Sequence, residues 1–183
     1  MYAYNDPSAT DITLTQTGGA VSGQNYGIYG NNQGTGSTVI GVAGDVTATE
    51  GIGVAGYNGG LAQDIRINQT TGTITGHEFG MVADNGGTGS IQITSSGRVS
   101  GGIYGIYASQ AGAGPTAIAI HGDVNGDAGA GILSVSGSDV TIDIAPPIAI
   151  TVSSMPKAMT PSPGPAEPSP AGSTARTAPT PPR

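Results

Sequence analysis

The chain has 183 residues, including 33 Gly and 13 Pro but no Cys or Trp, and its 5 basic and 12 acidic residues give a formal net charge of −7. These numbers exclude disulfide frameworks and thiolate zinc sites. The scarcity of Lys and Arg argues against a nucleic-acid partner. No apolar run approaches the roughly 20 residues of a membrane-spanning helix. Abundant Gly and β-branched residues favour strands over helices.

Residues 1–10 form a lead-in without the basic and apolar regions of a signal peptide. From residue 11 the chain repeats itself about every 25 residues, and three short elements recur in each repeat. The first element is a pair of aliphatic residues separated by one residue. The pairs are Ile12/Leu14, Ile40/Val42, Ile65/Ile67, Ile91/Ile93, Ile118/Ile120 and Ile142/Ile144.

The other two elements each contain a glycine. The second has the form Gly-x-[Val/Ile]-x and starts at Gly19, Gly44, Gly72, Gly97 and Gly122. The third has the form x-Gly-[Ile/Val/Met]-x and is centred on Gly27, Gly53, Gly80, Gly105 and Gly131. Polar stretches rich in Gly and Asn, such as residues 31–36 and 85–89, follow the third element and are typical of turns.

Alternation of apolar and polar residues within each element indicates a β-strand. Three strands per repeat predict an all-β fold, a right-handed parallel β-helix (β-solenoid) of five to six coils over residues 11–145, with coils ~4.8 Å apart. Equivalent aliphatic residues then stack into inward ladders. One predicted ladder is Val21/Val46/Ile74/Val99/Val124, and another is Ile28/Val54/Met81/Ile106/Ile132. The sixth coil is expected to break at Pro146, which suggests a fragment of a longer rod.

Composition changes abruptly near residue 145. Of the 33 Gly, 31 precede it, and 11 of the 13 Pro follow it. Residues 146–183 are therefore predicted to be a disordered Pro/Ala/Ser/Thr-rich tail. It is either a genuine linker or the product of a frameshift. The spacing from Pro165 to Pro168 is compatible with docking of an aromatic groove, although a solvated tail is the simpler interpretation.

Two groups of residues are candidates for metal or catalytic sites. Residues 123–127 read Asp-Val-Asn-Gly-Asp, as at the start of a calcium loop, but Ala128 and Ser134 stand where that loop requires Gly and Glu. His77 and His121 are expected to be solvent-facing residues at strand ends. The sequence thus predicts no catalytic, cofactor-binding or metal site, and no cofactor.

Asp11, Asp64 and Asp139 each precede an aliphatic pair. We expect them to form an acidic ladder at a solvated corner, with a weak cation site as the alternative.

The repeats DITLTQTGGAVSGQNYGIYG, SIQITSSGRVSGGIYGIYAS and DIRINQTTGTITGHEFGMVADNGGTG resemble the passenger region of bacterial autotransporters. That resemblance covers about residues 11–145. It implies an internal piece of a large surface-exposed or secreted protein of Gram-negative bacteria, with neither signal peptide nor outer-membrane barrel in this chain. It also implies a location at the cell surface or outside the cell.

The leading functional hypothesis is a structural or adhesive stalk without chemistry of its own. Its expected partners are glycans or proteins of host or neighbouring cells and adjoining coils of a longer parent chain, with no nucleic acid and no membrane insertion. A carbohydrate-active β-helix enzyme fragment is the alternative, but Arg66 and Arg98 are the only basic residues of the rod and the acidic residues are dispersed. Ice binding is a third hypothesis, suggested by Thr13, Thr15, Thr47, Thr73, Thr75 and Thr94.

Overall fold

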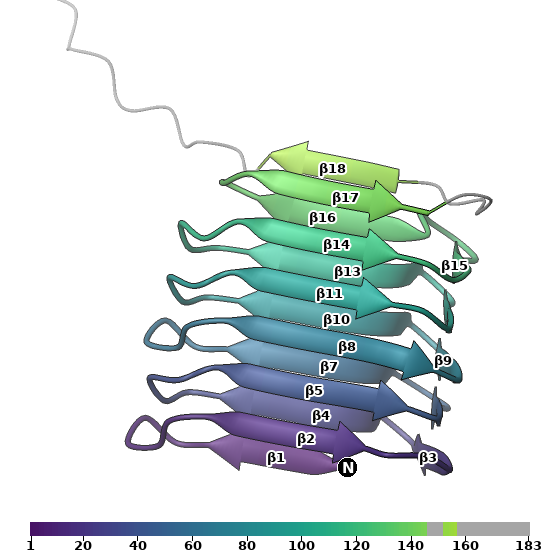
Figure 1. The fold of residues 1–183 in the computed structure, drawn as a ribbon, viewed down its shortest axis with the longest axis horizontal. Coiled ribbons are helices and arrows are strands. Elements are labelled where there is room, and N and C mark those ends of the chain that lie inside the picture. Colours follow the sequence, from purple (N-terminus) through teal and green to yellow (C-terminus); the bar gives the residue numbers. More distant parts are fainter. Residues whose placement is uncertain (146–151, 157–183) are drawn as a thin grey trace, which may run out of the picture.

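The structure, a computed structural model, describes residues 1–145 and 152–156. This part of the chain is all-β and contains no helix. Its strands form three parallel sheets that wrap around a common interior, so the molecule is a β-solenoid (Figure 1). Strands on the near side run rightward and those behind run leftward while the chain climbs from its N-terminus, which makes the winding right-handed (Figure 1).

Each complete coil contributes one strand to each sheet. Sheet A contains β1 (Tyr2–Asn5), β4 (Tyr26–Asn32), β7 (Ile52–Asn58), β10 (Phe79–Asn85), β13 (Tyr104–Gln110), β16 (Ile132–Ser136) and β18 (Val152–Pro156). Sheet B contains β2 (Ile12–Gln16), β5 (Thr38–Ala43), β8 (Ile65–Thr71), β11 (Ile91–Ser95), β14 (Thr116–Ile120) and β17 (Val140–Ile144). Sheet C contains β3 (Ala20–Gly23), β6 (Asp45–Ala48), β9 (Thr73–Gly76), β12 (Arg98–Gly101) and β15 (Val124–Gly126).

Two of the predicted aliphatic ladders are confirmed residue by residue. In sheet C, Val21 pairs with Val46, and the series continues through Ile74 and Val99 to Val124. In sheet A, the ladder Ile28/Val54/Met81/Ile106/Ile132 is continuous, and all five side chains are fully buried. Burial of such side chains contributes about 1.5–3 kcal/mol each before chain entropy is subtracted, so stacking of coils stabilises the rod.

In sheet B, alignment by aliphatic pairs is wrong at three of the five steps between neighbouring coils. Ile40 pairs with Leu14 rather than Ile12, and Ile118 pairs with Ile93 rather than Ile91. Ile142 does pair with Ile118, as alignment of the aliphatic pairs requires. The cause is that Thr38, Thr116 and Val140, not an aliphatic pair, begin the inward face of these strands.

A further ladder of polar side chains, four of which are buried amides, lies where sheet A turns toward sheet B. Its members occupy the last positions of successive strands and are Asn5, Asn32, Asn58, Asn85, Gln110 and Ser136. Asn58 donates to the backbone oxygens of Gln63 at 3.2 Å and Asp64 at 3.0 Å and accepts from Thr38 Oγ1 at 2.7 Å. The side-chain amides of the ladder donate hydrogen bonds to backbone oxygens of the turns between sheets A and B.

Two segments outside the predicted repeats contain strands. The predicted lead-in, 1–10, contains β1, which pairs with β4 and completes sheet A. Five residues of the segment predicted to be disordered, 152–156, have strand backbone instead, and β18 pairs with β16. The other tail residues, 146–151 and 157–183, lie outside the described part, as does the predicted break at Pro146.

Candidate functional site

All eight aromatic residues of the chain lie on sheet A. The sequence contains seven Tyr and one Phe, and they are Tyr2, Tyr4, Tyr26, Tyr29, Tyr57, Phe79, Tyr104 and Tyr107. We call the outer surface of sheet A that carries them the aromatic face. Parallel register brings these residues together, because each coil places the third repeat element at the same angular position around the rod.

The aromatic face contains two groups of rings in contact. In the lower group, Tyr29 stacks on Tyr2 with ring centroids 4.7 Å apart, and it lies 4.6 Å from Tyr26 and 5.6 Å from Tyr57. In the upper group, Phe79 lies 5.9 Å from both Tyr104 and Tyr107. Such ring pairs add about 0.5–1.5 kcal/mol to the burial of their surfaces.

Three smaller apolar side chains lie beside these rings and form a cluster that is separate from the interior core. Ile52, Ala55 and Val82 are buried there, packed with Tyr29, Tyr57, Phe79 and Tyr107. The centre of the face is therefore well packed, whereas Tyr2 and Tyr26 are 68% and 37% exposed at its lower end. The face thus presents ring surface on a rigid sheet, an arrangement suited to contact with a partner.

The charges beside the aromatic face are negative. Asp84 stands directly opposite Tyr57 in the sheet, and Glu78 precedes Phe79 in the chain. Burial, followed by nearby Tyr26 and Tyr29 and the carboxylates of Asp84 and Glu78, raises the pKa of Tyr57 well above its ordinary value. Burial and Tyr29 also raise the pKa of Tyr26. Both phenols therefore stay protonated near neutral pH.

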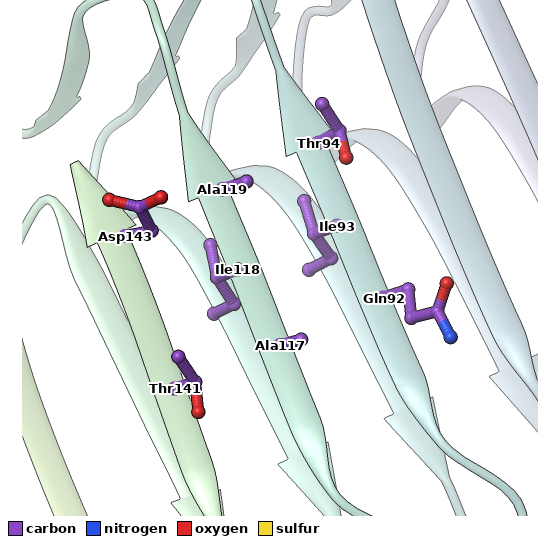
Figure 2. Close-up of a pocket in the computed structure, with 8 residues that line it drawn as sticks. All are labelled: Gln92, Ile93, Thr94, Ala117, Ile118, Ala119, Thr141 and Asp143. Atoms are coloured by element: carbon purple, nitrogen blue, oxygen red, sulfur yellow. The ribbon is translucent and has the colours of Figure 1, made fainter. Parts of the chain in front are cut away.

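Sheet B presents a polar outer surface with two shallow depressions. One has a volume of about 200 Å³ and lies over the small side chains of Ala117 and Ala119. Figure 2 shows this depression with the polar residues of its rim, which are Gln92, Thr94, Thr141 and Asp143. The second, of about 310 Å³, lies over Gly41. Both arise because a small residue interrupts a ladder of larger side chains. Each is therefore a shallow, open depression in a flat surface and not an enclosed cavity.

The aspartates that precede sheet B stand at one corner, as expected, but in alternation with serines. Asp11 Oδ1 accepts the backbone N–H of Ser37 at 2.7 Å, and Asp64 Oδ1 accepts that of Ser90 at 2.7 Å. Backbone hydrogen bonds stack Asp11, Ser37, Asp64 and Ser90 in that order. The carboxylates are thus two coils apart, ~10 Å by sheet spacing. Their oxygens bind backbone and hydroxyl groups.

The residues considered for a calcium loop and the two histidines occupy ordinary positions of the repeat. Val124 belongs to the sheet C ladder, and Asn125 donates to Asp127 Oδ1 at 2.6 Å. His77 and His121 are exposed at different corners, before β10 and after β14. Across residues 1–145 and 152–156, no three His, Asp or Glu side chains are grouped as metal ligands would be.

Threonines are not aligned into a regular array. Thr94 lies between Asn68 and Ala119 in sheet B, and Thr15 pairs with Gly41. In sheet C, Thr47 and Thr75 are neighbours, but Ser100 and Asn125 continue the same ladder. Of the threonines considered for ice binding, only Thr47 and Thr75, on two adjacent coils of sheet C, are therefore aligned with each other.

Sequence reasoning misses both the aromatic face and the buried amides. The aromatic signal is present in the third repeat element, which carries an aromatic before its glycine in Tyr26, Phe79 and Tyr104. Asn58 and Asn85 each precede a glycine, a pattern typical of turns, and this pattern conceals their place inside the rod.

Comparisons with protein-family models, with curated proteins and with solved structures gave no match. Within the described ranges there is no helix long and apolar enough to cross a membrane. The solenoid and the surfaces of its three sheets are therefore the basis for a functional proposal.

Proposed function

We propose that the chain is a stalk segment of a bacterial surface-exposed or secreted protein of the autotransporter type, and that its side faces make adhesive contacts. The observation that carries the proposal is the continuous parallel pairing of strands in all three sheets over consecutive coils. Each coil repeats the same inward ladders and lengthens the rod by ~4.8 Å. A fold built by repetition provides length and a flat lateral surface.

Adhesion through many weak contacts suits the surfaces of this rod. Sheet B offers amide, hydroxyl and small side chains on a flat surface. Glycans and proteins on host or neighbouring cells have complementary hydroxyl and amide groups. Residues 1–152 carry 11 acidic and 2 basic side chains, so the rod repels polyanions such as nucleic acids.

The adhesive role is tested with beads coated with the full chain. Retention under flow is measured on epithelial cell layers and on lawns of other bacteria, with Ile106→Asp chains as an unfolded control of nearly the same composition. We expect several-fold greater retention of beads that carry the folded chain. Equal retention of both kinds of bead would contradict adhesion, and cleavage of a pectin-like polymer by the chain would favour the enzymatic alternative.

A further inference from the structure

The aromatic face has an occupant within the chain itself. We propose that the proline-rich C-terminal segment, 157–183, folds back and docks along the aromatic face in a polyproline II conformation. This inference concerns a contact within the chain and stands apart from the stalk proposal.

The point at which the described chain ends favours this contact. The last described strand, β18, belongs to sheet A and pairs with β16. β16 in turn adjoins β13, which carries Tyr104 and Tyr107. Segment 157–183 therefore starts at the edge of the one sheet that carries aromatic residues, two strands from the nearest ring. Segments leaving from sheet B or sheet C would start on a different side of the rod.

The segment is long enough to cover the whole face. The strand order places β18 and β1 six spacings apart, or ~29 Å at ~4.8 Å per strand. A polyproline II helix rises ~3.1 Å per residue, so about ten residues span that distance. Segment 157–183 has 27 residues, which leaves ample chain for the reversal in direction that docking requires.

The composition of the segment fits an aromatic partner. Eight of its residues are prolines, including Pro161, Pro163, Pro165, Pro168 and Pro170. Proline-rich segments dock on aromatic surfaces because their rings pack against aromatic rings and their conformation is largely formed before binding. Sheet A provides rings spaced along the rod axis from β13 to β1.

The charges are complementary as well. Segment 157–183 contains Lys157, Arg176 and Arg183 against a single Glu167. The aromatic face is bordered by Glu78 and Asp84. Opposite charges steer the segment toward this face, and its attachment to β18 provides an effective concentration near the millimolar range, so a weak contact is sufficient.

The absence of cysteine from the chain allows a direct test. Ser173→Cys in the full chain creates a single site for a nitroxide spin label, whose paramagnetism removes NMR signals of nearby amides. We expect loss of the amide signals of Tyr57 and Tyr107 on sheet A. The amides of Asn68 and Thr94, on the outer surface of sheet B, should keep their intensity. Equal loss on both sheets, or no loss on either, would overturn the proposal.

Two control samples show whether the signal loss comes from the prolines and from the same chain. Replacing the five prolines at 161, 163, 165, 168 and 170 by serine in the spin-labelled chain should restore the Tyr57 and Tyr107 signals without altering the rod, since the changes lie outside it. Persistent signal loss in that variant would contradict recognition of the prolines.

Mixing isotope-labelled chain with spin-labelled, unlabelled chain should cause no loss of amide signals. Loss in the mixture would assign the contact to the tail of a second copy and overturn docking within one chain.

Discussion

Gly80 lies so close to Val99 of the next coil that a side chain at position 80 has no room. A Cβ built on Gly80 would stand 2.5 Å from Val99 Cγ1 and 2.6 Å from the backbone oxygen of Gly105. The same relationship recurs one coil below, where a Cβ on Gly53 would stand 2.7 Å from Ile74 Cγ2. The inward residue of the second element, such as Val99, thus leaves room only for glycine at the third element of the preceding coil, such as Gly80.

Gly80→Ala should therefore destabilise the rod. The added methyl group meets backbone as well as side-chain atoms, so relaxation of Val99 alone does not relieve it, and overpacking of this kind costs about 1–3 kcal/mol. Urea unfolding followed by circular dichroism measures the change. Gly60→Ala is the matched control, because its nearest neighbour, the oxygen of Gly86, would be 4.0 Å away. Equal stability of the two variants would contradict the close coil-to-coil contact.

Ile106→Asp should unfold the rod around the fourth complete coil. Ile106 is fully buried between Met81 and Ile132, so the substitution places an unpaired carboxylate in the apolar interior. We expect a loss of more than about 4 kcal/mol. Ile103→Asp makes the same chemical change three residues earlier, where the side chain is 40% exposed, and should have little effect. Thermal melts that do not distinguish the two variants would rule out the register of sheet A.

Asn58→Ala should cost about 2–3 kcal/mol in the free energy of unfolding. The change removes the donors to Gln63 and Asp64 and leaves Thr38 Oγ1 without the amide oxygen to which it donates, so buried polar groups lose their partners. Asn68→Ala, on the exposed surface of sheet B, is the control. If both variants melt at the temperature of the unmodified chain, the amide ladder does not stabilise the rod.

Asp64 should make the rod sensitive to acid. Burial acts to raise its pKa, but hydrogen bonds from Ser90 and the charge of Arg66, whose Nη2 lies 2.7 Å from Asp64 Oδ2, outweigh burial and hold the pKa below the ordinary 3.8. A carboxyl group with a lowered pKa in the folded state contributes stability above pH 3.8, and this contribution is lost as the pH falls through the folded-state value.

The free energy of unfolding should accordingly fall as the pH is lowered from about 5 to about 2, and it should fall less steeply for Asp64→Asn. Urea titrations at a series of pH values measure both slopes. Asp143→Asn, which changes an exposed aspartate on sheet B, serves for comparison. Parallel slopes for the unmodified chain and for Asp64→Asn would show that this carboxylate has the same pKa in the folded and unfolded states.

Fold class and two inward ladders were predictable because the glycine elements recur at nearly constant spacing. Gly44, Gly72 and Gly97 keep Val46, Ile74 and Val99 in register across sheet C. Sheet B lacks such a marker. Its inward positions accept Thr38, Gln69 or Ser95 as well as aliphatic residues, so alignment by aliphatic pairs slips by two residues.

Candidate surfaces were harder to predict than the fold. An asparagine next to glycines is typical of an exposed turn, yet Asn85 lies at the end of a strand with its side chain inside and donates to Gln63 and Gly89 oxygens. The aromatic face depends on the coil length, because it forms only when residues about 25 apart lie on one sheet. Sequence order alone does not state which outward residues share that sheet.

Cysteine cross-linking tests the parallel coil register most directly. The structure pairs Thr94 with Ala119, whereas alignment by aliphatic pairs places Thr94 opposite His121. Paired residues on adjacent parallel strands are ~4.8 Å apart, within the range that a disulfide bridges, and a shift of two residues adds ~6.6 Å along the strand. The chain with Thr94→Cys and Ala119→Cys should form an internal disulfide under mild oxidation, and the chain with Thr94→Cys and His121→Cys should not. Cross-linking of the second pair but not the first, or of neither, would contradict the solenoid described here.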